Sequence, residues 1–412
     1  MTLSRREFIS GVSAAAAALS GVSPTSLSGV QPRAVAVGSD DPLGVRSDFP
    51  VVEQSVYLDS AYITPSPLQA VEAAQAFAEA KARDPVSLGG MLQETNLMRQ
   101  RFATLVGATE VEIGVLFATS DGENIVSRAL DLERGDNVVI DDLHYDTTYL
   151  LYQQLAERQG LEVRIVKSEE GRAPVDAFSE HIDERTRLIS VAWVSHQNGF
   201  RHNLAGLADL AHAHEAYLYA DAIQGIGALD IDVRSTGIDF LTAGTYKWLL
   251  GGYGVAPFYV REELLERIGT DRFGSLNIAE ELGEHRFRVY DDARKYGYAT
   301  MGFGSIFQLR AALDYLLTVG VPNIETHTVA LARRLNTGLV GQGHDVWTPA
   351  DNRSPIVTFR HHRDITLVRS TLEDAGIRIS FKAEGKELRA GIALFNNSDD
   401  IDKLLDVTGT WA

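Results

Sequence analysis

The chain has 412 residues, of which 45% are hydrophobic and 23% charged, and its formal net charge is −18. This is the composition of a globular protein long enough for one large α/β core and a smaller companion domain. The acidic balance, without a basic block, argues against nucleic-acid binding, and the absence of cysteine excludes disulfides, thiolate metal sites and a cysteine nucleophile.

The first residues are predicted to be an export signal. Residues 4–9 read SRREFI, a twin-arginine pattern, and a weakly apolar stretch follows as far as Leu19. Small residues at Ala34 and Ala36 suit a signal peptidase. We expect residues 1–36 to direct export by the twin-arginine machinery, which carries folded proteins, to the periplasm or the cell exterior. A chance arginine pair or an uncleaved anchor is the alternative.

Beyond an N-terminal arm over residues 37–60, a helix is expected over 68–83, and short apolar runs then alternate with amphipathic stretches. The runs predict strands at residues 115–117, 137–140, 163–166, 188–194, 216–220 and 254–260. Between them, helices are expected at 123–132, 147–159 and 204–214. This alternation predicts a mostly parallel sheet with helices on both faces. Pro257 in the last run suggests an edge strand or a bulge.

The pattern changes at about residue 305. Two long helices are expected at 306–319 and 323–339, followed by short strands near 356–359, 377–380 and 388–393 and a helix at 399–407. The sequence therefore predicts a large domain over residues 61–304 and a small α+β domain over 305–412.

An acid at the end of a strand and a lysine on the next loop carry the strongest chemical signal. Asp221 ends the run 216–220, and Lys247 follows about one βα unit later. A lysine amine can form a Schiff base with the aldehyde of pyridoxal 5'-phosphate (PLP). A carboxylate can keep the pyridine nitrogen protonated, so that the ring accepts electrons. The pair predicts a PLP site, which neither residue would indicate alone.

Other strand ends point to the same edge of the sheet. Residues 118–124 (ATSDGEN) join a strand to a helix, where free amides favour an anion and Gly122 lets the backbone approach a phosphate. An ordinary N-cap is the alternative. Tyr145 and His196 follow two further strands, where open α/β sheets bind ligands, although such polar residues also cap helices. The spacing of His and acidic residues gives no metal-binding pattern.

The chain resembles the class V aminotransferase family of PLP-dependent enzymes, in the isopenicillin N epimerase-like branch, over about residues 56–407. DAIQ at 221–224 and KWLLG at 247–251 carry the resemblance. It implies the aspartate aminotransferase-like PLP transferase fold. It also implies that Asp221 lies on the pyridinium nitrogen, Gln224 lies near the phenolic oxygen, and Lys247 is the Schiff-base lysine.

The resemblance implies further cofactor contacts at Asp121, Gly122, Glu123, Tyr145, His196, Gln224, Thr245 and Thr300. Tyr145 would stack on the ring, and His196 stands where the family has asparagine. Gly244 stands where the family often has a phosphate-binding serine, whose part Thr242 or Thr245 could take.

Two residues have implied roles beyond the cofactor. Arg389 matches the arginine that clamps the substrate carboxylate, which its planar fork suits, although a surface ion pair is the alternative. Thr300 matches a threonine that reaches the phosphate of the neighbouring subunit. A homodimer with a shared active site is therefore expected.

The resemblance implies an enzyme acting on an amino acid or an amino-bearing peptide or metabolite. Transamination is favoured, with epimerisation and C–S or β-elimination lysis as alternatives and a non-catalytic PLP-fold binding protein as a minor one. Cysteine desulfuration in its usual form is excluded, because no cysteine can carry the persulfide.

Overall fold

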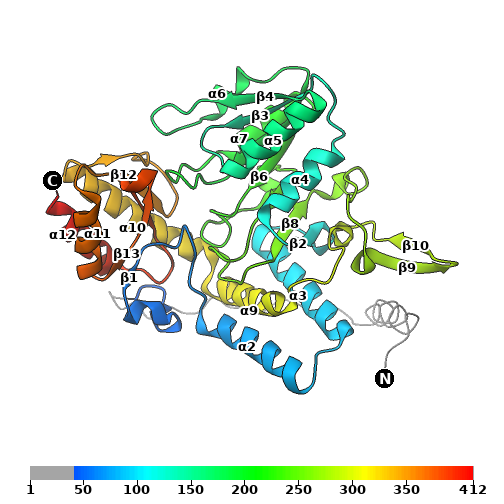
Figure 1. Ribbon diagram of the computed structural model, residues 1–412, viewed down its shortest axis with the longest axis horizontal. Coiled ribbons are helices and arrows are strands. Elements are labelled where there is room, and N and C mark those ends of the chain that lie inside the picture. The colour runs from blue at the N-terminus through cyan, green and yellow to red at the C-terminus, as the bar shows by residue number, and fades with distance from the viewer. Residues whose placement is uncertain (1–40, 412) are drawn as a thin grey trace.

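The computed structural model describes residues 41–411 (Figure 1). The expected export signal lies outside these residues. At the centre is a seven-stranded sheet in the order β2 (Ile113–Leu116), β8 (Ala256–Val260), β7 (Phe240–Thr242), β6 (Tyr217–Asp221), β5 (Thr186–Ala192), β3 (Asn137–Asp141) and β4 (Glu162–Val166). The pairs from β4 to β7 are parallel, and β8 runs antiparallel to both of its neighbours. The prediction of a mostly parallel sheet is confirmed.

Helices cover both faces of this sheet because alternate side chains of each strand point to opposite sides. In β3, Val138 and Ile140 pack in the cluster that holds α4 (Thr119–Ala129) and α5 (Asp146–Gln159). Val139 belongs instead to the cluster that holds α7 (Leu204–Ala213). Burial on both faces explains why these strands are continuous apolar runs in the sequence. Two short helices, α6 (Val175–Ser179) and α8 (Val233–Thr236), complete the connections.

The expectation that Pro257 marks an edge strand or a bulge is wrong. Its strand β8 lies inside the sheet between β7 and β2, and the β2 register runs through Pro257 without a shift. The β7 ladder ends at the pair Thr242–Phe258, and at the next position only Ala243 N donates, to Pro257 O at 3.3 Å. The missing amide hydrogen therefore falls where the β7 ladder has already ended.

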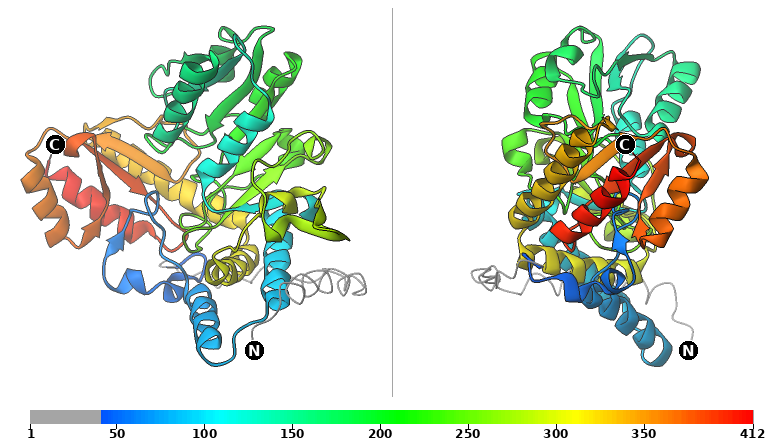
Figure 2. Two further views of the ribbon diagram at one scale, coloured as in Figure 1. Left: turned by 45° about the vertical axis from the view of Figure 1, so that its right-hand side comes forward. Right: turned by 90° about the vertical axis from the view of Figure 1, so that its left-hand side faces the viewer.

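Three long helices form a layer beside the large sheet (Figure 2). They are α2 (Leu68–Arg83), α3 (Leu88–Val106) and α9 (Phe303–Val319), and α9 packs against both of the others. The sequence predicts α2 with these bounds but does not predict α3. A two-stranded hairpin of β9 (Ile278–Gly283) and β10 (Arg286–Val289) projects from the body of the molecule (Figure 1).

The C-terminal part holds a four-stranded antiparallel sheet in the order β11 (Asp345–Val346), β12 (Ile356–Arg360), β15 (Glu387–Gly391) and β14 (Ser380–Lys382). Apolar side chains of α10 (Val321–Gly341), α11 (Ile365–Asp374) and α12 (Ser398–Gly409) pack with it. From the N-terminal arm, β1 (Val56–Tyr57) pairs in parallel with β13 (Ile377–Arg378). Leu58 of the arm packs in the core of the small sheet, whereas Phe49 of the arm and Ile306 and Leu309 of α9 join the core of the large one. The domain limits at residues 61 and 305 stay a prediction.

Within residues 41–411, no helix combines the length and the apolar character that crossing a bilayer requires.

Candidate active site

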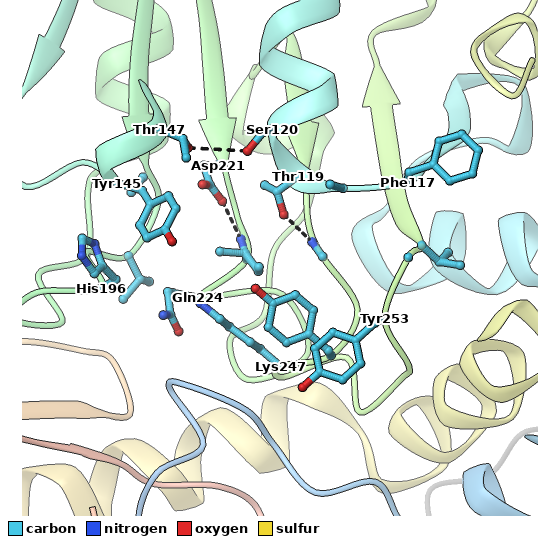
Figure 3. A pocket seen from close by; sticks show the side chains of 18 residues that line it. Phe117, Thr119, Ser120, Tyr145, Thr147, His196, Asp221, Gln224, Lys247 and Tyr253 are labelled. Atoms are coloured by element: carbon cyan, nitrogen blue, oxygen red, sulfur yellow. Dashed lines mark hydrogen bonds between the residues drawn. The ribbon is translucent and has the colours of Figure 1, made fainter. Parts of the chain in front are cut away.

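A cavity of about 380 Å³ opens where β5, β6 and β7 end, beside the first turn of α4 (Figure 3). Open α/β sheets bind ligands at this edge. Its walls are formed by Phe117, Ala118, Thr119, Ser120, Tyr145, Thr147, Ala192, Val194, His196, Asp221, Ile223, Gln224, Gly244, Tyr246, Lys247, Tyr253, Gly254 and Val255. The predicted residues Lys247, Asp221, Gln224, Tyr145 and His196 are thus brought together.

Asp221 and Lys247 share this cavity in a buried setting. Asp221 is the last residue of β6, and its Oδ1 accepts a hydrogen bond of 3.0 Å from Ile223 N. Burial raises the pKa of Asp221 to about 6, against the opposing effects of that hydrogen bond and of the Lys247 charge. Burial lowers the pKa of Lys247 to about 8, although the Asp221 charge favours the ammonium. About one tenth of the amine is therefore neutral at pH 7, far more than in an ordinary lysine, and the neutral amine is the nucleophile.

The first turn of α4 forms a cradle for an anion. Thr119 Oγ1 accepts a hydrogen bond of 2.9 Å from Gly244 N, and Ser120 Oγ lies 3.5 Å from Thr147 Oγ1. A Cβ at Gly244 would lie 2.9 Å from Ile223 Cδ1 and 3.0 Å from Thr119 Oγ1, so Gly244 packs closely against this turn. Exposed amides at a helix N-terminus, flanked by hydroxyls, suit a phosphate group.

Asp121, Gly122 and Glu123, which follow in the same helix and are predicted cofactor contacts, do not line the cavity. Asp121 accepts hydrogen bonds from Ala118 N and from Arg272 Nη1. Gly122 packs on β7, where a Cβ would lie 2.0 Å from Thr242 Oγ1. The structure thus gives Gly122 a packing role. The cofactor contacts predicted for Asp121 and Gly122 stay predictions.

Glu123 is fully buried and anchors a polar chain behind the cavity. Its carboxyl accepts from Ser190 Oγ at 2.5 Å and from Thr148 Oγ1 at 2.8 Å, and burial raises its pKa to about 7. Ser190 Oγ also lies 3.2 Å from His144 Nε2, while His144 Nδ1 accepts from Tyr145 N at 2.7 Å. Because burial lowers the pKa of His144 to about 4, the ring is neutral and donates through Nε2. The chain thereby fixes the backbone of Tyr145.

Tyr145 and His196 stand edge to face, with ring centroids 5.1 Å apart (Figure 3). Within residues 41–411, His196 Nδ1 is buried without a hydrogen-bond partner. Burial, and then the charges of Lys382 and Arg389, lower the pKa of His196 to about 3. The ring is therefore neutral and offers the cavity an unused polar atom, as expected of a site that receives a polar ligand.

The other predicted residues lie at varying distances from the cavity. Gln224 lines it, but its side chain already donates to Ala61 O and accepts from Trp248 Nε1. Thr245 is buried and donates to Gly252 O and Val255 O, so its hydroxyl fixes the loop after Lys247. Thr300 is exposed and outside the cavity of this chain. Cofactor binding by Thr245 and Thr300 stays a prediction.

Arg389 lies behind the His196 wall, on β15 of the small sheet. Its Nη1 donates a hydrogen bond of 2.7 Å to His196 O, and its Nη2 donates one of 3.1 Å to Ser380 Oγ. The Ser380 hydroxyl in turn donates a hydrogen bond to Asp59. Within residues 41–411, Arg389 Nε is buried without a partner. The guanidinium is therefore fixed next to the cavity with donor capacity to spare. Its role as the carboxylate clamp stays a prediction.

Two aromatic wall residues were not predicted as site residues. Tyr246 and Tyr253 stack with ring centroids 4.8 Å apart and an angle of 19° between the planes. The Lys247 Nζ lies over the Tyr246 ring, 5.8 Å from its centroid. The one signal in the sequence is an aromatic residue inside the glycine run GGYG at residues 251–254, after the lysine.

A lysine amine and an acid buried in one cavity, next to a cradle for phosphate, meet the requirements of PLP chemistry, and the protein is a PLP-dependent enzyme. The chain belongs to the Aminotransferase class-V family, which matches residues 56–404. Its cofactor is pyridoxal 5'-phosphate. Lys247, Asp221 and the first turn of α4 are the groups of this chain that fit it.

Known proteins similar to this chain include cysteine desulfurases and a C–S lyase. A probable cysteine desulfurase of Methanothermobacter thermautotrophicus is 28% identical over 386 residues, covering 87% of this chain and 95% of its own. A cysteine desulfurase of Thermococcus onnurineus has a similar structure, with a TM-score of 0.81, 22% identity, and coverage of 91% of this chain and 98% of its own. A cystine C–S lyase, solved with its product cysteine persulfide, gives a TM-score of 0.82 at 20% identity, covering 88% and 100%.

These similarities confirm the predicted PLP-dependent transferase fold, with a large mixed sheet and a small C-terminal antiparallel sheet. They confirm the class V family but not the narrower branch, because the relatives named above are desulfurases and a C–S lyase, not isopenicillin N epimerase.

Proposed function

We propose that this protein is a PLP-dependent C–S lyase that removes the sulfur substituent of a cysteine-type amino acid by β-elimination. This was an alternative in the sequence analysis, where transamination was favoured. Support comes from the desulfurases and the cystine C–S lyase to which the chain is similar. The observation that carries the proposal is the complete absence of cysteine. The enzyme has no thiol that could accept the sulfur atom. The sulfur therefore leaves together with the group R attached to it, as R–SH.

The bound cofactor supplies an electron sink for the carbanion formed at the substrate Cα. The neutral amine of Lys247 removes the Cα proton, and burial favours this neutral state. The Cβ–S bond then breaks with its electron pair moving to sulfur, which leaves as a thiol. Water releases the remaining carbons, so that R–S–CH₂–CH(NH₃⁺)–COO⁻ and water give R–SH, pyruvate and ammonium without net oxidation. Arg389 would hold the carboxylate.

Product analysis tests the proposal. The loaded protein is incubated in deuterated water with a panel that includes cysteine, cystine, S-alkyl cysteines and simple amino acids. A C–S lyase gives ammonium, pyruvate and the sulfur leaving group in equal amounts, the last being sulfide from cysteine, a thiol from S-alkyl cysteines and cysteine persulfide from cystine. Alanine with a persulfide would indicate a desulfurase, a keto acid with the side chain intact an aminotransferase, and deuterium at Cα with the amine retained an epimerase. Any of these three results as the main reaction would refute the proposal.

We further propose that the enzyme acts outside the cytoplasm. The support is the twin-arginine pattern SRREFI at residues 4–9. An enzyme whose cofactor is held in a buried cavity needs to be loaded before export, and the twin-arginine route accepts folded cargo. Fractionation of cells that make the native chain tests this proposal, since an active protein confined to the cytoplasm would contradict it. An R5K/R6K variant should then remain in the cytoplasm.

A homodimer with shared active sites is also proposed, on the family resemblance around Thr300. Mixing Lys247→Ala subunits with Thr300→Ala subunits tests it. Shared sites predict that the mixture recovers activity which neither variant has alone, whereas independent sites predict no recovery.

A further inference from the structure

The stacked pair Tyr246 and Tyr253 leaves an aromatic surface open at the mouth of the cavity. Tyr253 lines the cavity, yet 59% of its surface is exposed. In Figure 3 it lies near Lys247, on the opposite side of the view from Tyr145 and His196. A large apolar ring in water is unfavourable by about 25 cal/mol for each Å² that a ligand could cover. The exposed ring is therefore a surface on which a ligand gains affinity.

Space is available beside this ring. Gly254 also lines the cavity, and a Cβ added there would meet nothing within 4 Å. Tyr253 stands between Gly252 and Gly254, so its two sequence neighbours place no side chain against it. Asp221 is the only carboxylate among the wall residues, and it is buried at the end of β6. Tyr253 is therefore exposed at a part of the wall that carries no carboxylate.

The position of the Lys247 amine indicates where the amino group of a substrate binds. Its Nζ lies over the Tyr246 ring, so a substrate amino group that reaches this point lies next to the tyrosine pair. Arg389 lies behind the opposite wall and contacts His196. With the amino group at Lys247 and the carboxylate on the Arg389 side, the part of the cavity left for the side chain on Cα includes Tyr253.

We propose that Tyr246 and Tyr253 form a leaving-group subsite for a flat apolar sulfur substituent, so that S-aryl conjugates of cysteine are preferred to cysteine itself. The proposal rests on the proposed C–S lyase function and names its substrate class. Stacking on the free face of Tyr253, together with the apolar area covered, would strengthen binding of an aryl group by about tenfold.

Binding of analogues that lack the C–S bond tests the subsite without requiring C–S cleavage. 2-Amino-4-phenylbutanoate carries CH₂ in place of the sulfur of S-phenylcysteine, and 2-aminobutanoate is the matching analogue of cysteine. Calorimetry on the PLP-loaded protein should give an affinity about tenfold higher for the phenyl compound. Tyr253→Ala should remove most of this advantage and change 2-aminobutanoate binding less than about twofold, while Tyr253→Phe should retain it, because stacking needs the ring alone.

Phe287→Ala is the matched control. Phe287 is 40% exposed on strand β10 of the projecting hairpin and does not line the cavity, so its removal should leave the selectivity intact. Equal affinity of the wild type for both analogues would overturn the proposal, and so would an equal loss of both in Tyr253→Ala. A change of oligomeric state in Tyr253→Ala with unchanged selectivity would identify the pair as a subunit contact instead. Selective binding without thiol release from S-phenylcysteine would support the subsite and refute the lyase.

Discussion

Arg389 Nη1 donates a hydrogen bond of 2.7 Å to the carbonyl oxygen of His196. The bond joins β15 of the small sheet to the loop after β5, which lines the cavity. A second hydrogen bond, from Nη2 to Ser380 Oγ, fixes the orientation of the guanidinium. The small sheet therefore presents a fixed cation to a site that is built almost entirely from the large domain.

Arg389→Lys should lower kcat/KM by about 10- to 100-fold, mainly through KM, because lysine keeps the charge but loses the planar fork. Steady-state kinetics with a cysteine-type substrate measures this effect. Arg360→Lys is the control, since Arg360 lies on the neighbouring strand β12 and is paired with Glu387 and Asp345. A fall in activity of the same size in both variants would point to damage to the small sheet instead of a lost carboxylate contact.

The reactivity of Lys247 should depend on pH with a midpoint near 8 in the cofactor-free protein, because burial lowers the pKa of its amine to about that value. Only the neutral amine attacks an aldehyde, so the rate of PLP uptake should rise as the pH passes through 8 and level off above it. Absorbance stopped flow over pH 6–10 measures this profile.

Two neighbours should move this midpoint in opposite directions. The charge of Asp221 raises the pKa of Lys247, and the charge of Lys382 lowers it. Asp221→Asn should therefore shift the midpoint below 8, and Lys382→Met should shift it upward. A midpoint near 10, unchanged in both variants, would mean that Lys247 is exposed to solvent and far from both groups.

Glu123→Gln should change how stability depends on pH. Burial raises the pKa of Glu123 from 4.5 to about 7. The stabilisation from its protonated form is complete below pH 4.5 and is lost as the pH rises through 7. Between these values the folded protein holds a proton that the unfolded chain has released, so the wild type should lose up to about 1.4 kcal/mol of unfolding free energy per pH unit from this group.

Glutamine has no such proton, so the variant should lack this part of the slope. Urea titrations at pH 5 and pH 7.5 measure the difference. Glu157→Gln, on the exposed face of α5, should follow the wild type. Equal slopes in the wild type and Glu123→Gln would contradict a protonated carboxyl at this position.

Gly122→Ala should destabilise the protein by about 1–3 kcal/mol, because the new Cβ would lie 2.0 Å from Thr242 Oγ1. Thr242→Ala in the same chain should recover at least half of the loss, since it removes the clashing atom. Gly341→Ala is the control: its Cβ would meet nothing within 4 Å, so it should be neutral or stabilising. Equal stability of Gly122→Ala and the wild type would show that α4 does not pack this closely on β7.

Local signals explain which elements the sequence could predict. The helix Leu68–Arg83 follows a proline and has few helix breakers, so both of its ends are readable. The helix Leu88–Val106 was missed, because adjacent glycines at 89 and 90 obscure its start. The strand Phe240–Thr242 is too short for a periodic pattern, and only its place between β6 and β8 defines it.

The site shows the same division. Asp221 and Lys247 could be predicted because an acid that ends a strand and a lysine on the next loop have a distinctive spacing, and topology brings these segments to one edge of the sheet. The stacked pair Tyr246 and Tyr253 could not, because the path of the loop between them depends on tertiary packing, including a left-handed Leu250. The motif predicts a cofactor contact at Glu123, and burial of this side chain could not be foreseen from the motif. The contact itself stays a prediction.

The central claim is that the Lys247 amine carries the cofactor. Borohydride reduction of the PLP-loaded protein, followed by digestion and mass spectrometry, tests it most directly. The account predicts one pyridoxyl phosphate group per chain, on the peptide that contains Lys247. A modification at another lysine, or a native chain that stays unmodified and colourless after incubation with excess PLP, would contradict it.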